Sequence, residues 1–296
     1  MIVPSPRVAT SHMNHAVLLR TLGFVAVISS SCSVLIDTTT RQCESSKDCD
    51  ALGFDGEICI DKVCQAREAD ADWDCLTNIQ LPIAEQKDEV ALHIMVVDVI
   101  TTKPPENMHA EICPKLDVDC DRPLSGSSYV GDDGRLVVTV PPGFDGYIEI
   151  TAPSITPALF FVTRPVWQDV DYRHVLPVVS PEGFQGIAQA IGTTLDLNSL
   201  GHIYAFAADC GRNPAAGVHF EVDRTTATTA SYYMINEVPV ASASSTDPSG
   251  SGGFLNLTGG FTRITARVSR SGARIGESGF IVRPGAVSYP LVLPSP

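Results

Sequence analysis

The chain has 296 residues, of which 44% are hydrophobic and 18% are charged, a balance typical of folded proteins with two or three domains. Its 34 acidic and 20 basic side chains give a formal net charge of −14. Because Lys and Arg form no cluster, these numbers argue against a nucleic-acid partner. The 21 prolines and 23 glycines are spread among Thr, Ser and Val, as expected of short strands joined by tight turns.

Residues 1–31 predict a secretory signal peptide. Arg20 precedes the apolar run Leu22–Ile28, and Ser29, Ser30 and Ser31 follow it, which is the charged, apolar and small-residue order of such a signal. The run is much shorter than the ~20 residues that span a bilayer. Met13 is an alternative true start, because the residues before it add nothing to this pattern.

Cys32 directly follows the three serines, a position that resembles the lipobox of bacterial lipoproteins. The resemblance implies a diacylated cysteine at the mature N-terminus. It therefore implies a membrane partner through a lipid anchor, in an outer-membrane lipoprotein that faces the periplasm or the cell surface. Leu usually occupies the position of Ser29, so an ordinary cleaved signal or a free thiol at Cys32 is the alternative. Two or three acyl chains would anchor stably, since each buried methylene contributes about 0.8 kcal/mol.

The other eight cysteines are an even number, which suits four disulfides outside the cytoplasm. Four of them lie in residues 32–74, a segment too small for a core of its own without cross-links. Their spacing lacks the paired C-x-x-C knuckles of zinc sites, so we expect two disulfides and no metal. Three connectivities stay open for this group, which comprises Cys43, Cys49, Cys59 and Cys64.

The remaining four cysteines are expected to fasten the β-rich part of the chain. Cys113 and Cys120 enclose a six-residue loop that is short enough to close locally. That pairing leaves Cys75 for Cys210, a bond that would constrain a very long loop. The alternative pairs Cys75 with Cys113 or Cys120 and leaves the other for Cys210.

Residues 75–179 predict a first β-sandwich. The segment Val90–Val99 is apolar enough to be a strand buried over most of its length. Turn signals occur at Gly131–Gly134, where Asp-Gly supplies positive φ, and at Pro141–Gly146. Further strands are expected at His109–Cys113, Leu136–Val140, Tyr147–Ile150 and Leu159–Val162.

Residues 180–199 predict a short linking helix, and residues 200–296 predict a second sandwich. Ser180 can cap the helix and Pro181 fits its first turn. An apolar face recurs at helical spacing in Phe184, Ile187, Ala188 and Ile191.

The two β-rich blocks repeat the same features in the same order, which we interpret as a duplicated module. Each block has an opening strand with an Asp near its end, a Pro-containing connection, a middle turn, and then two strands around a Gly-containing turn. The paired features are Asp98 and Asp209, Pro104-Pro105 and Pro214, Asp132–Gly134 and Asp247–Gly250, and Pro142-Gly143 and Gly259-Gly260.

Three segments resemble the carboxypeptidase regulatory-like domain, a transthyretin-like β-sandwich of secreted bacterial proteins. They are Gly131–Gly143 in the first block, and Pro214–Val218 and Thr246–Phe254 in the second. The resemblance covers residues 85–295 and implies an all-β fold: two tandem transthyretin-like or Ig-like sandwiches after a small disulfide-rich segment. The layout is also similar to that of myxobacterial-type exported lipoproteins.

The family resemblance implies a structural or interaction role and provides no catalytic residues to carry over. A protein or glycan partner at the envelope would be in keeping with it. The sequence departs from the family pattern in two places: residues 224–245 form a long polar insert, and Cys113 and Cys120 lie in a loop where the family needs none.

No catalytic motif is supported by its context. The histidines outside the leader, His93, His109, His174, His202 and His219, are widely spaced. His109 and Glu111 match the H-x-E of zinc deaminases, yet the P-C-x-x-C that should follow is absent. Residues 249–253 are rich in Ser and Gly without the strand-to-helix setting of a nucleophile elbow.

Alternating acids at Asp117, Asp119 and Asp121 are weak calcium candidates. Arg122 and Ser128 occupy the positions where an EF-hand loop needs Gly and a bidentate Glu. The sequence therefore predicts a non-enzymatic surface lipoprotein with no cofactor. The alternative is an exported hydrolase that uses carboxylates or a metal on the sandwich loops.

Overall fold

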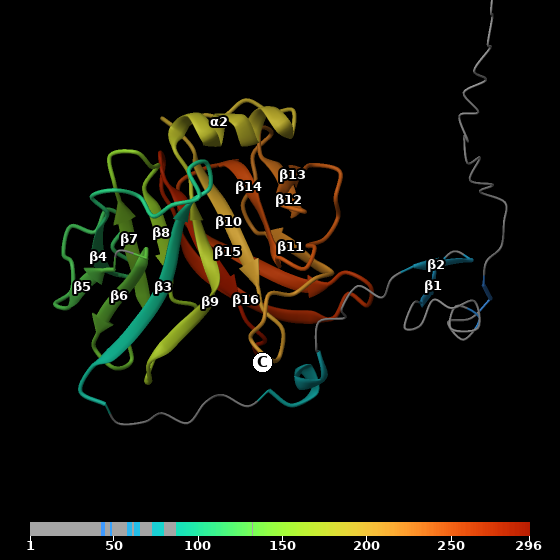
Figure 1. Cartoon of the computed structure of the whole chain (residues 1–296), viewed down its shortest axis with the longest axis horizontal. Coiled ribbons are helices and arrows are strands. Elements are labelled where there is room, and N and C mark those ends of the chain that lie inside the picture. Colours follow the sequence, from blue (N-terminus) through green and yellow to red (C-terminus); the bar gives the residue numbers. More distant parts are fainter. Residues whose placement is uncertain are drawn as a thin grey trace, which may run out of the picture.

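The computed structural model (Figure 1) describes residues 43–44, 48, 58–60, 62–65, 73–79, 87–131 and 133–296. The predicted signal peptide, the alternative start Met13 and the lipidation candidate Cys32 lie outside these residues. Before the main body stand a hairpin of β1 (Ile58–Ile60) and β2 (Val63–Gln65) and a 3₁₀ helix, η1 (Asp74–Thr77). In the described ranges, no helix combines the length and apolarity that crossing a bilayer requires.

Within residues 87–179, seven strands form a sandwich of two sheets. One sheet has the order β5-β6-β3-β9, and the strands of the other follow as β4-β7-β8. The strands are β3 (Val90–Asp98), β4 (His109–Pro114), β5 (Ser127–Val130), β6 (Arg135–Val140), β7 (Gly146–Thr151), β8 (Ala158–Phe161) and β9 (Val170–Val178).

Within residues 200–296, a second set repeats that order, as β12-β14-β10-β17 and β11-β15-β16. Its first and last strands pair in parallel, as β3 and β9 do, and the other pairs within each copy are antiparallel. The predicted all-β class is confirmed, and the matching order supports duplication. The strands are β10 (Gly201–Ala207), β11 (Val218–Val222), β12 (Ala230–Ile235), β13 (Val238–Val240), β14 (Ser251–Leu257), β15 (Gly260–Val268), β16 (Arg274–Val282) and β17 (Val287–Val292).

One interpretation of the sequence is wrong. Residues 224–245 are not simply an insert, because they contain β12, which holds the place that β5 holds in the first copy. Only β13, which forms a hairpin with β12, has no counterpart. The Thr- and Ser-rich flanks of β12 concealed a strand whose two tyrosines, Tyr232 and Tyr233, are both buried.

The linking helix α2 (Pro181–Ala190) forms for the reasons predicted. The Oγ of Ser180 accepts a hydrogen bond from the Gly183 N–H at 3.0 Å, and Pro181 stands in the first turn. Such a cap satisfies one of the donors that a helix start leaves unpaired. Phe184 and Ala188 are buried, and Figure 1 shows α2 lying across the ends of the sheets near β10 and β14.

The repeated aspartates at the ends of β3 and β10 are loop caps. The Oδ1 of Asp98 accepts the backbone N–H groups of Ile100 and Thr101, and the Oδ1 of Asp209 accepts that of Asn213. In each copy, the backbone of the same aspartate also forms hydrogen bonds within the loop. The N–H of the aspartate donates to a later carbonyl, and its carbonyl accepts a later N–H. Short acidic side chains are suited to this local bonding, so these acids are used in turns.

The middle turns are duplicated in the same chemical detail. The Oδ1 of Asp133 accepts the N–H of Arg135 at 3.0 Å, and the Oδ1 of Asp247 accepts the N–H of Ser249 at 2.8 Å. Gly134 and Gly250 have φ values of 81° and 66°, which glycine adopts without the steric cost of a Cβ. Both copies therefore use the same turn, with an aspartate that accepts a backbone N–H and a glycine with positive φ.

The two copies share a sheet. The last strand of the second copy, β17, pairs in parallel with β8 of the first, with Val287 opposite Ala158 and Tyr289 opposite Phe160. The pairing gives a continuous eight-stranded sheet, β13-β12-β14-β10-β17-β8-β7-β4. Main-chain bonding therefore runs across the boundary between the copies, with no sheet edge left at that boundary.

This shared sheet has a core on each face. Alternate residues of β8 and β10 point to opposite faces: Phe160 and Phe206 join the core with the sheet of β3, whereas Phe161 and Ile203 join the core with the sheet of β15. The four residues of β8 and all six of β17 are consequently buried. A sheet covered on both faces explains why these strands read as continuous apolar runs.

We expect Gly250→Ala to destabilise the fold more than Gly272→Ala does. Both glycines have positive φ, but a Cβ at Gly250 would lie 2.6 Å from the Ala215 nitrogen and 2.7 Å from the Ala207 oxygen, whereas Gly272 has open space around it. Backbone conformation alone costs about 1–2 kcal/mol, and overpacking adds about 1–3 kcal/mol. Urea unfolding measures the free energy of unfolding of both variants. Equal losses would contradict the close packing of Gly250 against the backbone of Ala207 and Ala215.

Candidate functional site

The buried histidines are part of the packing. His174 and His202 are buried against Phe206 and Phe184, with ring centroids 5.2 and 4.9 Å apart. The Nδ1 of His202 accepts the Asn256 N–H at 3.2 Å. Burial lowers the pKa of His174, and lowers that of His202 to about 4, so both rings are neutral near pH 7.

The exposed histidines have local partners. The Nε2 of His109 lies 3.4 Å from Glu111 on the same strand, and His219 lies beside the Tyr233 hydroxyl and the Ser244 carbonyl. Among the described residues, no group of three potential metal-ligand atoms contains a histidine. The histidine patterns weighed in the sequence therefore do not assemble into a metal centre in this part of the chain.

The disulfides that the structure describes in full are the two that the sequence favoured. Cys113 bonds to Cys120, and Cys75 bonds to Cys210 over a sequence separation of 135 residues. Cys43 is also disulfide-bonded. The side chains of Cys49, Cys59 and Cys64 lie outside the described residues.

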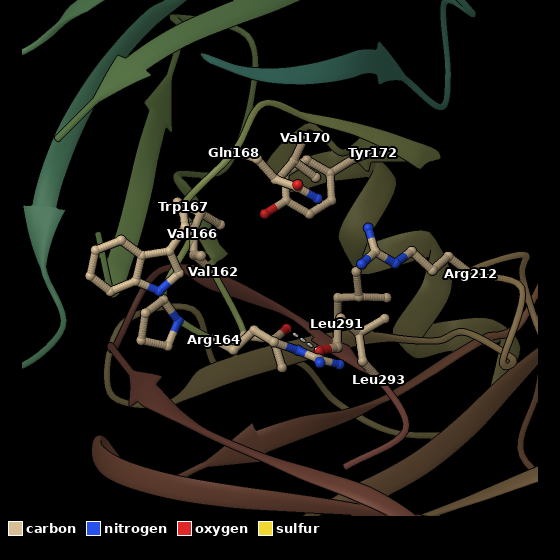
Figure 2. Close-up of a pocket in the computed structure, with 12 residues that line it drawn as sticks. Val162, Arg164, Val166, Trp167, Gln168, Val170, Tyr172, Arg212, Leu291 and Leu293 are labelled. Carbon is tan, nitrogen blue, oxygen red and sulfur yellow. Dashed lines mark hydrogen bonds between the residues drawn. The ribbon is translucent and has the colours of Figure 1, made fainter. Parts of the chain in front are cut away.

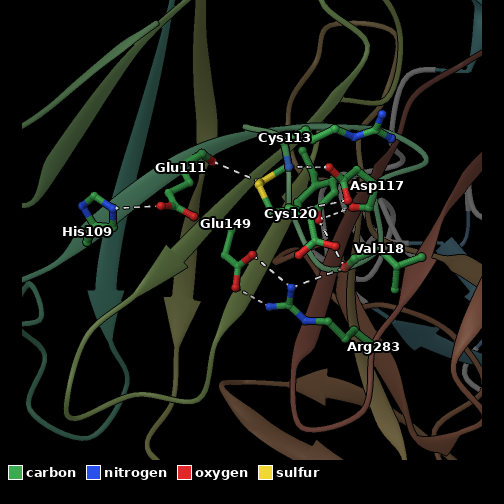
Figure 3. Close-up of a disulfide and its surroundings, with 11 residues drawn as sticks. His109, Glu111, Cys113, Asp117, Val118, Cys120, Glu149 and Arg283 are labelled. Atoms are coloured by element: carbon green, nitrogen blue, oxygen red, sulfur yellow. Dashed lines mark hydrogen bonds and ion pairs between the residues drawn. A yellow bond between two sulfur atoms is a disulfide. The ribbon is translucent and has the colours of Figure 1, made fainter. Parts of the chain in front are cut away.

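Asp117, the first of the calcium candidates, lies in the loop closed by the Cys113–Cys120 disulfide (Figure 3). The two carboxylate oxygens of Asp117 accept the backbone N–H groups of Asp121 and Arg122. Asp119 and Asp121 do not join Asp117 in any described group of three close ligand atoms. The one such group comprises Cys113, Cys120 and Glu149, and its sulfurs are already bonded to each other.

An ion pair beside this disulfide links the two copies. Glu149 on β7 and Arg283, just after β16, are only 13% and 15% exposed, and two nitrogens of the guanidinium bond the two carboxylate oxygens. Burial by itself lowers the pKa of Arg283, but the hydrogen bonds and charge of Glu149 more than offset it, so the pKa lies above its ordinary value. Arg283 also donates to the Val118 carbonyl, which fixes the disulfide loop to the second copy.

A pocket of about 70 Å³ opens on another part of the boundary between the copies (Figure 2). Its polar residues are Thr163, whose hydroxyl donates to the Leu291 carbonyl, and Arg164, Gln168, Tyr172 and Arg212. Trp167, which is 44% exposed, stands at the rim. The floor is apolar and is contributed by both copies. It consists of Val162, Val166, Val170, Leu291 and Leu293.

Two arginines bring positive charge to this pocket. Burial, and then the charge of Arg212, lower the pKa of the Arg164 guanidinium. Arg164 donates one hydrogen bond to the Pro294 carbonyl at 3.2 Å. Neither Arg164 nor Arg212 forms an ion pair with a carboxylate in the described structure. Most of their guanidinium donors are therefore available, since each guanidinium carries five.

The duplicated loop after β10 supplies Arg212. Arg212 has a φ of 62°, and its N–H donates to the Asp209 carbonyl. In the first copy, Thr102 has the matching conformation, with a φ of 56° and its N–H on the Asp98 carbonyl. A second hollow of about 90 Å³, which contains the Cys75–Cys210 disulfide, is lined by the same two arginines and by Asp209. The Asp209 carboxylate accepts hydrogen bonds from Asn213.

Two of the arginines at the boundary, Arg164 and Arg283, lie in similar short segments of the sequence, which the motif search did not find. Val162-Thr163-Arg164-Pro165 follows β8, and Val282-Arg283-Pro284 lies at the end of β16. The strands β8 and β16 hold equivalent places in the two copies, and an Arg-Pro pair follows each, with Thr163 as an additional residue in the first copy. Arg164 and Arg283 therefore have similar places in the two copies. Aligning the two halves by strand order makes the repeat visible.

A larger groove of about 470 Å³ lies between β3, β9, α2 and the face of β10 and β17. Its lining is mostly apolar and includes Ile100, Val175 and Phe184. The Tyr204 hydroxyl donates to Ser251 at 3.2 Å, and the Tyr289 hydroxyl donates to the Pro177 carbonyl at 2.8 Å. Its polar lining is thus largely bonded within the protein.

Comparisons with known proteins add little to this geometry. No protein-family model matches the chain, and a search of curated proteins finds no match. Among solved structures, a streptococcal ancillary pilin is 12% identical, with 69% of this chain and 68% of that chain covered and a TM-score of 0.21. FdeC, an Escherichia coli adhesin, is 11% identical, with 69% and 66% covered and a TM-score of 0.16. At these TM-scores, neither likeness supports an argument about function.

We expect Glu149→Gln to lower the free energy of unfolding by about 2–5 kcal/mol, because it leaves the Arg283 charge buried without its partner. The exposed pair of Glu221 and Arg267, at 3.1 Å, provides the matched control, and Glu221→Gln should cost about 0–1 kcal/mol. Chemical denaturation measures both. Similar losses in the two variants would show that the buried pair does not hold the copies together.

Proposed function

We propose that the protein is a non-enzymatic, exported lipoprotein of the cell envelope, anchored through Cys32, whose two β modules form a structural and binding unit. In this proposal, the Cys-rich segment of residues 32–74 connects the anchor to the folded body. Its partners are the membrane and a molecule recognised by the body.

The observation that carries the proposal is the disulfide between Cys75 and Cys210. It ties the segment that enters the body to the second copy, and disulfides persist mainly in oxidising compartments outside the cytoplasm. Together with the shared sheet, the bond makes the body a cross-linked unit rather than two jointed domains. Such a unit suits a surface element that holds a fixed shape.

We further propose that each copy is a module of the carboxypeptidase regulatory-like kind. The support is the seven-strand order that the two copies share, together with the aspartate-capped loops and the Asp–Gly turns. Function in such a module comes from sites on the scaffold, not from the scaffold itself.

The non-enzymatic part of the proposal is supported by how the candidate catalytic groups are used. His174 and His202 are packed among aromatic rings, and Glu149 is bonded to Arg283. An exported hydrolase would need an acid and a base facing one cleft. The polar residues of the pocket in Figure 2 are instead two arginines, a glutamine, a tyrosine and a threonine.

Metabolic labelling with a palmitate analogue tests the anchor. We expect the wild-type chain to be labelled and to sediment with membranes, and Cys32→Ala to be exported without label, because only the Cys32 thiol can accept the diacyl group. Ser31→Ala, which keeps the thiol and a small residue before it, is the matched control and should be labelled. Equal labelling of wild type and Cys32→Ala would overturn the anchor.

A further inference from the structure

The strongest unexplained feature is the different surroundings of two arginines that have similar places in the two copies. Arg283 is neutralised by Glu149 from the other copy. Arg164 occupies a similar place after β8, yet burial and then the like charge of Arg212 lower its pKa. Asp209 lines the neighbouring hollow with both arginines, but its carboxylate is bonded by Asn213 and forms no ion pair with either of them in the described structure. The two guanidinium groups therefore repel one another, and a bound anion would relieve that repulsion.

The lining of the two-arginine pocket restricts the kind of anion. Its floor of valines and leucines is apolar, and both guanidinium groups lie toward the side of Leu293 (Figure 2). An inorganic anion would leave that floor in contact with water. An anion with an apolar group would cover the floor and meet the arginines at the same time.

The size of the pocket sets the scale of the ligand. By the same measure of volume, a water needs about 10–15 Å³, so 70 Å³ accommodates a carboxylate and a few carbon atoms. Gln168 and Tyr172 offer an amide and a hydroxyl on the far side from Leu291 (Figure 2). Arginine is the side chain best suited to bind a planar carboxylate through two hydrogen bonds.

We propose that the two-arginine pocket binds a carboxylate that carries a short branched apolar group. The carboxylate lies between Arg164 and Arg212, and the apolar group lies on the floor. Two sources share this chemistry: a free branched-chain acid, and the C-terminal residue of a polypeptide that ends in Leu or Val. The inference goes beyond the proposed function and does not depend on Cys32, because Arg164 and Arg212 are in the described body.

Calorimetric titration of the purified full-length chain tests the site with four probes. They are isovalerate, a short peptide ending in Leu with a free carboxylate, the same peptide as its C-terminal amide, and inorganic phosphate. We expect the free carboxylate to bind at least about tenfold more tightly than the amide, because the amide cannot accept charge-assisted bonds from both arginines. Binding of isovalerate alone identifies a free acid as the source, and preference for the peptide acid identifies a chain end.

Variants separate the site from general charge effects. Arg212→Gln, on an exposed loop, should weaken carboxylate binding by about tenfold or more. Arg263→Gln makes the same charge change at an exposed position of β15 and should leave binding unchanged. Trp167 at the rim also reports binding through its fluorescence in a Trp73→Phe background, since the chain has two tryptophans.

Three results would overturn the proposal. They are equal affinity for the peptide acid and its amide, tighter binding of phosphate than of either carboxylate, or unchanged carboxylate binding by Arg212→Gln. Absence of binding by all four probes at millimolar concentration would also overturn it. None of these outcomes bears on acylation of Cys32, so the anchor and the pocket are tested separately.

Discussion

The parallel pairing of β8 with β17 is the interaction on which the rest of the structure depends. Without it, each copy would expose one edge strand with unpaired backbone groups, and the strands on either side would have one bare face. With it, the four-stranded sheet of the first copy covers one face of the shared sheet, and the three-stranded sheet of the second copy covers the opposite face. Two further contacts lie next to this junction. They are the ion pair of Glu149 and Arg283, and the packing of Phe161 on Phe280, whose ring centroids are 5.6 Å apart.

Duplication followed by divergence explains the unequal surfaces of the boundary between copies. The two modules kept the same turn chemistry, because each loop needs an aspartate cap and a residue with positive φ. They could not keep the same side chains at the junction, because the three-stranded sheet of one copy meets the four-stranded sheet of the other. Arg283 consequently meets a glutamate, and Arg164 meets Arg212.

Local features could be predicted from the sequence, since their causes lie within a few residues. The helix at Pro181–Ala190 follows from its cap and apolar spacing, and the Cys113–Cys120 bond follows from a short loop. The β8–β17 junction could not be predicted, because residues about 130 positions apart pair through backbone groups that every sequence has. β12 was missed for a related reason: its tyrosines are buried by strands that are distant in sequence.

Only part of the candidate site could be predicted from the sequence. Asp117 was noticed for its acidic neighbours, but its carboxylate caps a loop. The arginines of the pocket belong to no motif, and they come together only because the loop after β10 and the end of β8 lie at one boundary. The similar places of Arg164 and Arg283 become visible once strand order defines which strands are equivalent.

Native-state hydrogen exchange tests most directly whether the two copies form one cooperative unit. The informative amides are Val96 in the first copy, Ala207 in the second, and Val287, which donates across the junction to the Pro157 carbonyl at 2.9 Å. If the shared sheet unites the copies, all three amides exchange through the same global unfolding, with equal free energies. Exchange of Val96 through a much less costly opening that leaves Ala207 protected would contradict this account.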